Sequence, residues 1–153
     1  MKVLLDTNIV LRLGNRNHAM HSEALASVER LDANGHECVV VPQVLYEYWV
    51  VATRPPENNG LGMSVADADA TISQWTDVFR LFLDERGVFG HWRELVSKND
   101  VKGKSAHDAR LVAAMRRHGL TDLLTFNKSD FVRFPAINVF TPAEVLSGTI
   151  AVQ

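Results

Sequence analysis

The chain has 153 residues, a net charge of −2, 46% hydrophobic residues and 22% charged residues. These values are ordinary for one globular domain and exclude a chain-wide basic surface, so nucleic acid would have to meet a local basic patch. The apolar stretches are too short for a signal peptide or a membrane span, so we expect a cytoplasmic location. The single Cys38 excludes an internal disulfide and is expected to be a buried structural thiol. The length predicts one domain over residues 1–153.

Apolar runs alternate along the chain with helical patterns, which predicts an α/β fold with a central parallel sheet. Most of the expected strands are continuous apolar runs, as in strands buried on both faces: 2–5, 37–41, 79–83, 122–125 and 137–139. The run 79–83 could instead extend the preceding helix. The expected helices cover 20–34, 42–53, 64–78, 84–98 and 105–118, and a short one starts at Pro142.

The segment 55–62 contains two prolines, two asparagines and two glycines, which predicts a surface loop within the domain. Loops at the carboxyl ends of parallel strands border the ligand crevice in open α/β sheets. We therefore expect that this loop could border an active cleft.

Four acidic residues stand where a parallel sheet would bring them together. Asp6 ends the first apolar run, Glu47 lies within the helix after the second, Asp108 opens the helix 105–118, and Asp130 follows the fourth run. Carboxylates that converge in one cleft repel one another without a counter-cation. Oxygen-only ligands select hard cations such as Mg²⁺ or Mn²⁺. The pattern therefore favours a metal-dependent phosphoryl-transfer site.

Asp6 and Glu47 each have a simpler alternative explanation. Asp6 could cap the next helix, but Asp6-Thr7-Asn8 offers three capping residues where a cap needs one, so Thr7 and Asn8 are expected to support the carboxylate. Glu47 sits in a largely apolar helix, where an unpaired carboxylate is costly to bury, and could form an ion pair with Arg54.

Asp108 and Asp130 also have structural alternatives. Ser105 and Asp108 fit a capping box, yet Asp108 shares a helix face with apolar residues, which aims it inward near the positive end of the helix. Asp130 could cap a short turn. We expect it to be the fourth acid, with Asn127 and Thr125 as polar supports.

Basic residues surround these acids in the sequence. Each alone is most simply a solvated surface residue, but together they could form a rim that grips phosphates around an acidic centre. They are Arg54, Lys102, Lys104, Arg110, Lys128 and Arg133.

These motifs, in this order and spacing, resemble the PIN domain, and specifically the VapC toxin type of bacterial toxin–antitoxin systems. The residues that carry the resemblance are 5–8, Glu47 with 53–55 beyond it, 104–113 and 124–131. The resemblance extends over nearly the whole chain. It implies a three-layer α/β/α sandwich with a central parallel sheet of about five strands.

The resemblance also implies an activity and partners. The chain would be a Mg²⁺- or Mn²⁺-dependent endoribonuclease in which Asp6 and Asp108 hold the metal, while Glu47 and Asp130 complete the catalytic cluster. Asn127 stands where many relatives carry an acid, so Asp130 is expected to take that role. A cognate antitoxin would block the cleft, and the toxin would form a homodimer.

Three alternatives stay open. An Asp-nucleophile phosphatase would need a second Asp where this chain has Asn8. A catalytically weak RNA-binding or regulatory module could keep the same fold. A free-standing nuclease without an antitoxin is a variant of the main hypothesis.

Overall fold

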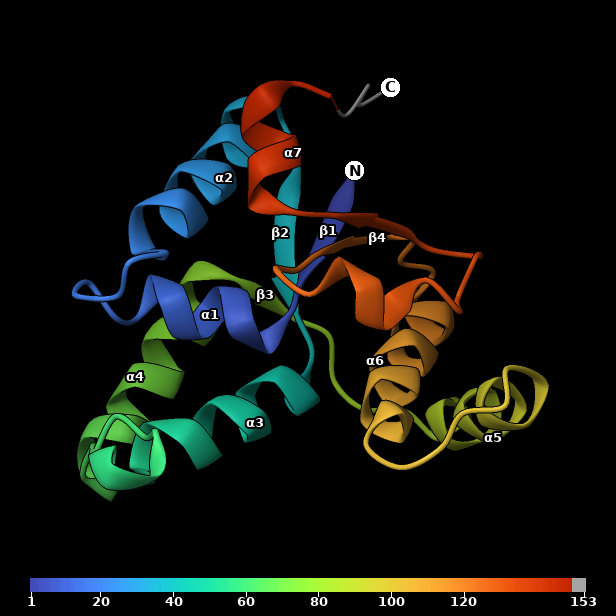
Figure 1. Ribbon diagram of the computed structural model, residues 1–153, viewed down its shortest axis with the longest axis horizontal. Coiled ribbons are helices and arrows are strands. Elements are labelled where there is room, and N and C mark those ends of the chain that lie inside the picture. The colour runs from blue at the N-terminus through green and yellow to red at the C-terminus, as the bar shows by residue number, and fades with distance from the viewer. Residues whose placement is uncertain (150–153) are drawn as a thin grey trace.

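The structure is a computed structural model that describes residues 1–149 (Figure 1). Five parallel strands form one sheet in the order β3-β2-β1-β4-β5. The strands are β1 Lys2–Leu5, β2 Glu37–Val40, β3 Arg80–Leu81, β4 Asp122–Leu124 and β5 Asn138–Phe140. The predicted α/β fold with a parallel sheet is confirmed. Residues 150–153 of the expected domain lie outside the described residues.

Helices cover both faces of the sheet. In Figure 1, α1 to α4 and α7 lie on one side, and α5 and α6 lie on the other, which gives the expected three layers. The helices are α1 Thr7–Leu13, α2 His21–Ala33, α3 Pro42–Thr53, η1 Pro56–Asn58, α4 Val65–Val78, α5 Gly87–Lys98, α6 Ser105–His118, η2 Lys128–Phe131 and α7 Pro142–Ser147. None of the helices within residues 1–149 has the length and apolar character that crossing a bilayer requires.

Strand β1 is the centre of both the sheet and the hydrophobic core. Leu4 is fully buried and lies between Val39 of β2 and Leu123 of β4. The chain leaves β1 for α1 on one face of the sheet and leaves β4 for η2 on the other (Figure 1). This is a topological switch point, where open α/β sheets form a crevice beyond the carboxyl ends of the strands.

Several element boundaries differ from the predictions by one residue or more. The expected strand 79–83 is reduced to β3, because Phe79 still caps the C-terminus of α4 through a hydrogen bond to Trp75. Helix α5 begins at Gly87 rather than at residue 84, as expected of a segment weakened by glycine. The last strand lies one residue later than predicted, at Asn138–Phe140.

The loop 55–62 caps the C-terminal end of α3. The amides of Leu61 and Met63 donate to the carbonyl oxygens of Val51 and Ala52 at 2.9 and 2.8 Å, which satisfies groups that a helix end leaves without partners. Residue 53 lies about 9 Å along the helix axis from Glu47. The loop therefore packs at the end of α3 that points away from the acidic residues.

This loop depends on Gly60. A Cβ atom there would overlap the carbonyl oxygen of Arg54, whereas a Cβ at Gly90, in α5, would meet open space. We expect Gly60→Ala to lower the free energy of unfolding by about 2–4 kcal/mol. Gly90→Ala should raise it by about 0.5–1 kcal/mol, because alanine favours the helix. Urea denaturation of both variants tests this, and equal stabilities would contradict it.

Candidate functional site

Asp6 ends β1 at the switch point and also begins α1. Its Oδ1 accepts a hydrogen bond from the Thr7 amide at 2.7 Å, so Asp6 is the N-cap of α1. Its Oδ2 accepts from Thr125 Oγ1 at 2.7 Å, across the gap between β1 and β4. The capping role and the place in the crevice are therefore compatible, because the two carboxylate oxygens have different partners.

Asn8 also connects the end of β1 to the end of β4. Its Nδ2 donates to Thr125 Oγ1 at 3.0 Å and to Asp6 Oδ2 at 3.3 Å, and its Oδ1 accepts from the Phe126 amide at 3.2 Å. The Asn127 amide donates to Thr125 Oγ1 at 3.0 Å. Asn8 and Thr125 thus hold Asp6 between the two strands, while the side chain of Asn127 is exposed.

Glu47 reaches the crevice from α3. Its Oε2 accepts from Thr7 Oγ1 at 2.6 Å, and its Oε1 accepts from Gln43 Nε2 at 3.0 Å. Arg54 instead donates to the carbonyl oxygen of Asn59 at 3.1 Å, at the far end of the helix. Glu47 therefore has neutral hydrogen-bond donors as partners, and Arg54 belongs to the loop.

Asp108 lies in the first turn of α6, where the positive end of the helix favours a carboxylate. The helix begins at Ser105, and its N-cap, Lys104, makes no side-chain capping hydrogen bond. The alternative capping box is therefore wrong. Burial, followed by the charges of Asp130, Asp6 and Glu47, raises the pKa of Asp108 to about 6.

The four acids act on one another electrostatically. Burial raises the pKa of Asp6 against the lowering effect of its Thr125 and Thr7 hydrogen bonds, and the charges of Glu47 and Asp130 raise it further. Asp130 is exposed in η2, at the mouth of the crevice. Asp6, Glu47, Asp108 and Asp130 are thus brought to one place, as the sequence pattern predicted, although their catalytic roles stay a prediction.

These residues fit a hard divalent cation. Burial, and after it the charges of neighbouring carboxylates, raises the pKa values of Asp6 and Asp108, and the side-chain atoms that could bind an ion here are all carboxylate oxygens. A carboxylate has about four acceptor sites, so Asp6 keeps capacity beside its hydrogen bonds. Within residues 1–149, no three acidic, histidine or cysteine side chains are arranged to hold one ion as they stand. An ion bound here would therefore draw the side chains together.

Two residues of the expected basic rim form ion pairs with acidic residues outside the cluster of four acids. Arg110 pairs with Asp84 at 3.3 Å, and Lys128 pairs with Glu144 at 2.6 Å on α7. Lys104 is exposed at the start of α6. Arg110 and Lys128, which are sequence neighbours of the acids, thus find acidic partners in other parts of the chain, while Arg110 also donates to Gln43 beside Glu47.

Gln43 is the residue that the sequence pattern did not single out. It lies one turn before Glu47 on α3, is 7% exposed, and contacts both Glu47 and the backbone of α6. A polar residue four positions before a half-buried carboxylate, on the same helix face, is the signal that could have identified it.

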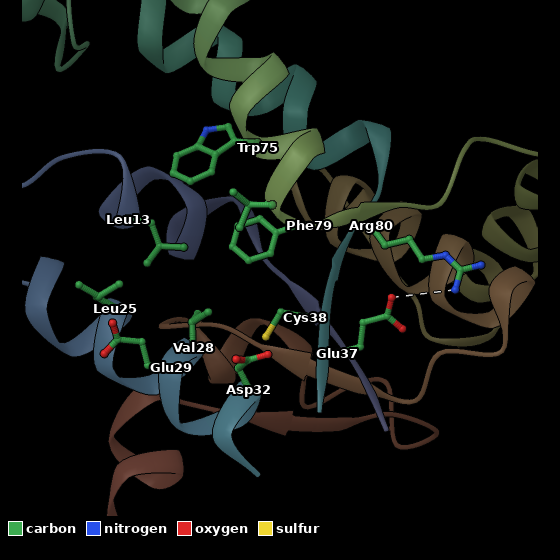
Figure 2. A pocket seen from close by; sticks show the side chains of 11 residues that line it. Leu13, Leu25, Val28, Glu29, Asp32, Glu37, Cys38, Trp75, Phe79 and Arg80 are labelled. Carbon is green, nitrogen blue, oxygen red and sulfur yellow. Dashed lines mark ion pairs between the residues drawn. The ribbon is translucent and has the colours of Figure 1, made fainter. Parts of the chain in front are cut away.

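A separate groove of about 470 Å³ lies between α1, α2, α4 and the edge of β2 (Figure 2). Trp75 stacks on Phe79 along one wall. Burial, followed by the charge of Asp32, raises the pKa of the Cys38 thiol to about 12. Cys38 is half-buried on the groove wall rather than fully buried as expected. The groove is lined by Leu13, Leu25, Val28, Glu29, Asp32, Glu37, Cys38, Trp75, Val78, Phe79 and Arg80.

Comparisons with known proteins agree with this fold. The PIN domain family model matches residues 3–137. Ribonuclease VapC48 of Mycobacterium tuberculosis is 25% identical over 150 residues, which cover 93% of this chain and 98% of that protein.

Two solved structures share the fold. VapBC2 from Rickettsia felis, bound to a DNA fragment from their promoter, has a TM-score of 0.67 at 16% identity over 92% of this chain and 98% of that one. A toxin–antitoxin complex from Klebsiella pneumoniae has a TM-score of 0.59 at 23% identity over 92% and 97%. At these identities the likeness concerns the fold alone.

Proposed function

Since this chain belongs to the PIN domain family, whose model matches residues 3–137, we propose that it is an endoribonuclease that uses Mg²⁺ or Mn²⁺. The observation that carries the proposal is the convergence of four mutually repelling carboxylates at the switch point of the sheet. The ribonuclease VapC48 supports RNA as the substrate class.

Asp6 and Asp108 would hold the ion in this proposal. A divalent ion, when bound, polarises the phosphate and lowers the pKa of a bound water. Glu47, oriented by hydrogen bonds from Thr7 and Gln43, would hold the attacking water and accept its proton. Attack of this water at phosphorus would form the new P–O bond and break the bond to the 3′-oxygen. The leaving oxygen would take a proton from solvent, which gives a 3′-hydroxyl and a 5′-phosphate. Asp130, at the mouth, completes the negative cluster.

The test is cleavage of total RNA by the purified protein with Mn²⁺ or Mg²⁺, beside a sample containing EDTA. We expect new 5′-phosphate ends that depend on the metal and disappear with EDTA. Metal binding without cleavage would restrict the substrate to an RNA absent from the sample. Neither cleavage nor metal binding would refute the nuclease and favour a binding module.

We further propose that this nuclease is the toxin of a toxin–antitoxin pair acting in the cytoplasm. The relatives that share its fold include a toxin–antitoxin complex, which supports a protein antitoxin as partner. A homodimer is also proposed, and light scattering of the purified chain tests it.

We propose that the groove in Figure 2 is the binding site for the antitoxin. Its apolar floor is edged by Glu29, Asp32 and Glu37, against one guanidinium from Arg80 that lies 4.0 Å from Glu37. This excess of acidic over basic side chains around an apolar floor suits an amphipathic segment that carries lysine or arginine. Helix α1 joins the groove to Asp6 over about 10 Å, so a segment seated there could continue into the acidic crevice.

Leu25 offers a test, because it is 40% exposed on the groove wall. Leu25→Glu should abolish co-purification with the product of a small gene next to this one, while RNA cleavage stays unchanged. Val65→Glu, a change at an exposed position on α4 outside the groove lining, is the matched control. Equal co-purification of that product with both variants would contradict the groove as the antitoxin-binding site.

A further inference from the structure

Gln43 uses all of its polar groups although its side chain is buried. Its Nε2 donates to Glu47 Oε1 at 3.0 Å and to the carbonyl oxygen of His107 at 2.8 Å. Its Oε1 accepts from Arg110 Nη1 at 3.0 Å. A buried amide is costly without such partners, and here each donor and the acceptor has one.

Its surroundings allow only one orientation of the amide. The carboxylate of Glu47 and the carbonyl of His107 are acceptors and must face the NH₂ group, whereas Arg110 is a donor and must face the oxygen. Arg110 is in turn held by Asp84 at 3.3 Å. Arg110 therefore locks the direction in which Gln43 donates.

The two acceptors of Gln43 belong to different layers of the fold. Glu47 lies on α3, and His107 directly precedes Asp108 on α6, on the opposite face of the sheet (Figure 1). Within residues 1–149, no hydrogen bond joins α3 to α6 without involving Gln43. One side-chain amide thus links the Glu47 carboxylate on α3 to the backbone of α6 one residue before Asp108.

We propose that Gln43 is a positioning residue that sets the spacing between Glu47 and Asp108, with Arg110 as the lock on its amide. The inference rests on the proposed nuclease function. Its basis is that a carboxylate moved by a fraction of an ångström loses geometry that metal binding and proton transfer require.

Gln43→Met tests this, because methionine keeps the length and packing of the side chain but removes its hydrogen bonds. We expect kcat to fall about 10–100-fold and the affinity for Mn²⁺, measured by calorimetry without RNA, to fall about 10-fold. The KM for RNA should change less than about threefold, because Gln43 is too buried to touch the substrate. Gln74→Met, at an exposed position on α4, is the matched control.

Arg110→Met supplies a second readout at a half-exposed position. Its kcat should fall about 3–10-fold, and the double variant should be no worse than Gln43→Met alone, because Arg110 acts through Gln43. If Gln43 and Arg110 had only a structural role, the variants would be less stable, but their Mn²⁺ affinity and kcat would be unchanged in the folded protein.

The outcomes separate the inference from the function on which it rests. Cleavage and Mn²⁺ affinity within twofold of wild type in Gln43→Met would overturn the inference and leave the nuclease intact. If Gln43→Met does not fold, Arg110→Met decides, and unchanged kcat and affinity there would overturn it. A wild-type protein that neither cleaves RNA nor binds Mn²⁺ would refute both.

Discussion

Replacing Asp6 by Asn should lower RNA cleavage about 10³-fold or more while raising the melting temperature by about 2–4 °C. The variant loses a proposed metal ligand. It also loses a charge that burial and the neighbours Glu47 and Asp130 disfavour, as the raised pKa of Asp6 shows. Asparagine still caps α1, because its side-chain oxygen can accept from the Thr7 amide. Activity and stability should therefore change in opposite directions.

Cleavage assays and thermal melts of the same preparations test this expectation. Asp77→Asn, which removes an exposed carboxylate from α4, is the control and should change neither quantity. A variant that melts below wild type would show that the Asp6 carboxylate stabilises the metal-free fold. Retained cleavage would remove Asp6 from the catalytic residues.

Asp108 should make the metal-free protein less stable as the pH rises. Its pKa is raised from 3.8 to about 6, chiefly by burial and then by the charges of Asp130, Asp6 and Glu47. The folded protein therefore binds this proton more tightly than the unfolded chain does. The resulting stabilisation is fully present below about pH 4 and is lost as the pH rises through about 6.

The difference between wild type and Asp108→Asn isolates this effect. We expect equal stabilities near pH 4 and a more stable variant at pH 7, measured by urea denaturation in EDTA. Glu94 and Glu144, whose pKa values are lowered by hydrogen bonds from Lys98 and Lys128, affect both proteins alike.

Divalent cation supplies the second arm of this experiment. Excess Mg²⁺ at pH 7 should raise the stability of wild type, because the ion binds the folded state, and should have much less effect on Asp108→Asn. A stability difference that does not vary between pH 4 and pH 7 would contradict the raised pKa. An equal response of both proteins to Mg²⁺ would contradict the role of Asp108 as a ligand.

The layers of the fold were predictable from sequence because the apolar runs of the central strands β1 and β4 are buried on both faces of the sheet. Strand β1 was predicted to the residue, since Lys2 and Asp6 bound its apolar run. The segment after α4 was ambiguous because Phe79 fits both a strand and a helix end, and the packing of Trp75 on Phe79 resolved it. Local pattern cannot supply such a contact.

The acidic residues that meet at the site were predictable from sequence, but the residues that contact them were less so. Asp6 and Asp108 stand at the ends of elements whose direction the pattern reveals, so their meeting follows from parallel topology. Lys128 and Arg54 were placed near the site only by sequence proximity, and the fold gives them Glu144 and Asn59 as partners. Gln43 was not predicted because only Glu47, of its three partners, is close in the sequence, while the other two lie 64 and 67 residues away.

The hydrogen bond from Thr125 to Asp6 joins positions 119 residues apart, at opposite ends of the chain. At about 5–20 residues per second, a ribosome needs about 6–24 s to pass from one to the other. A growing chain that already carries Asp6 and Glu47 has no β4 beside β1, so we expect a product truncated before residue 122 to lack the proposed nuclease activity. The order of synthesis would then delay that activity until β4 has been made.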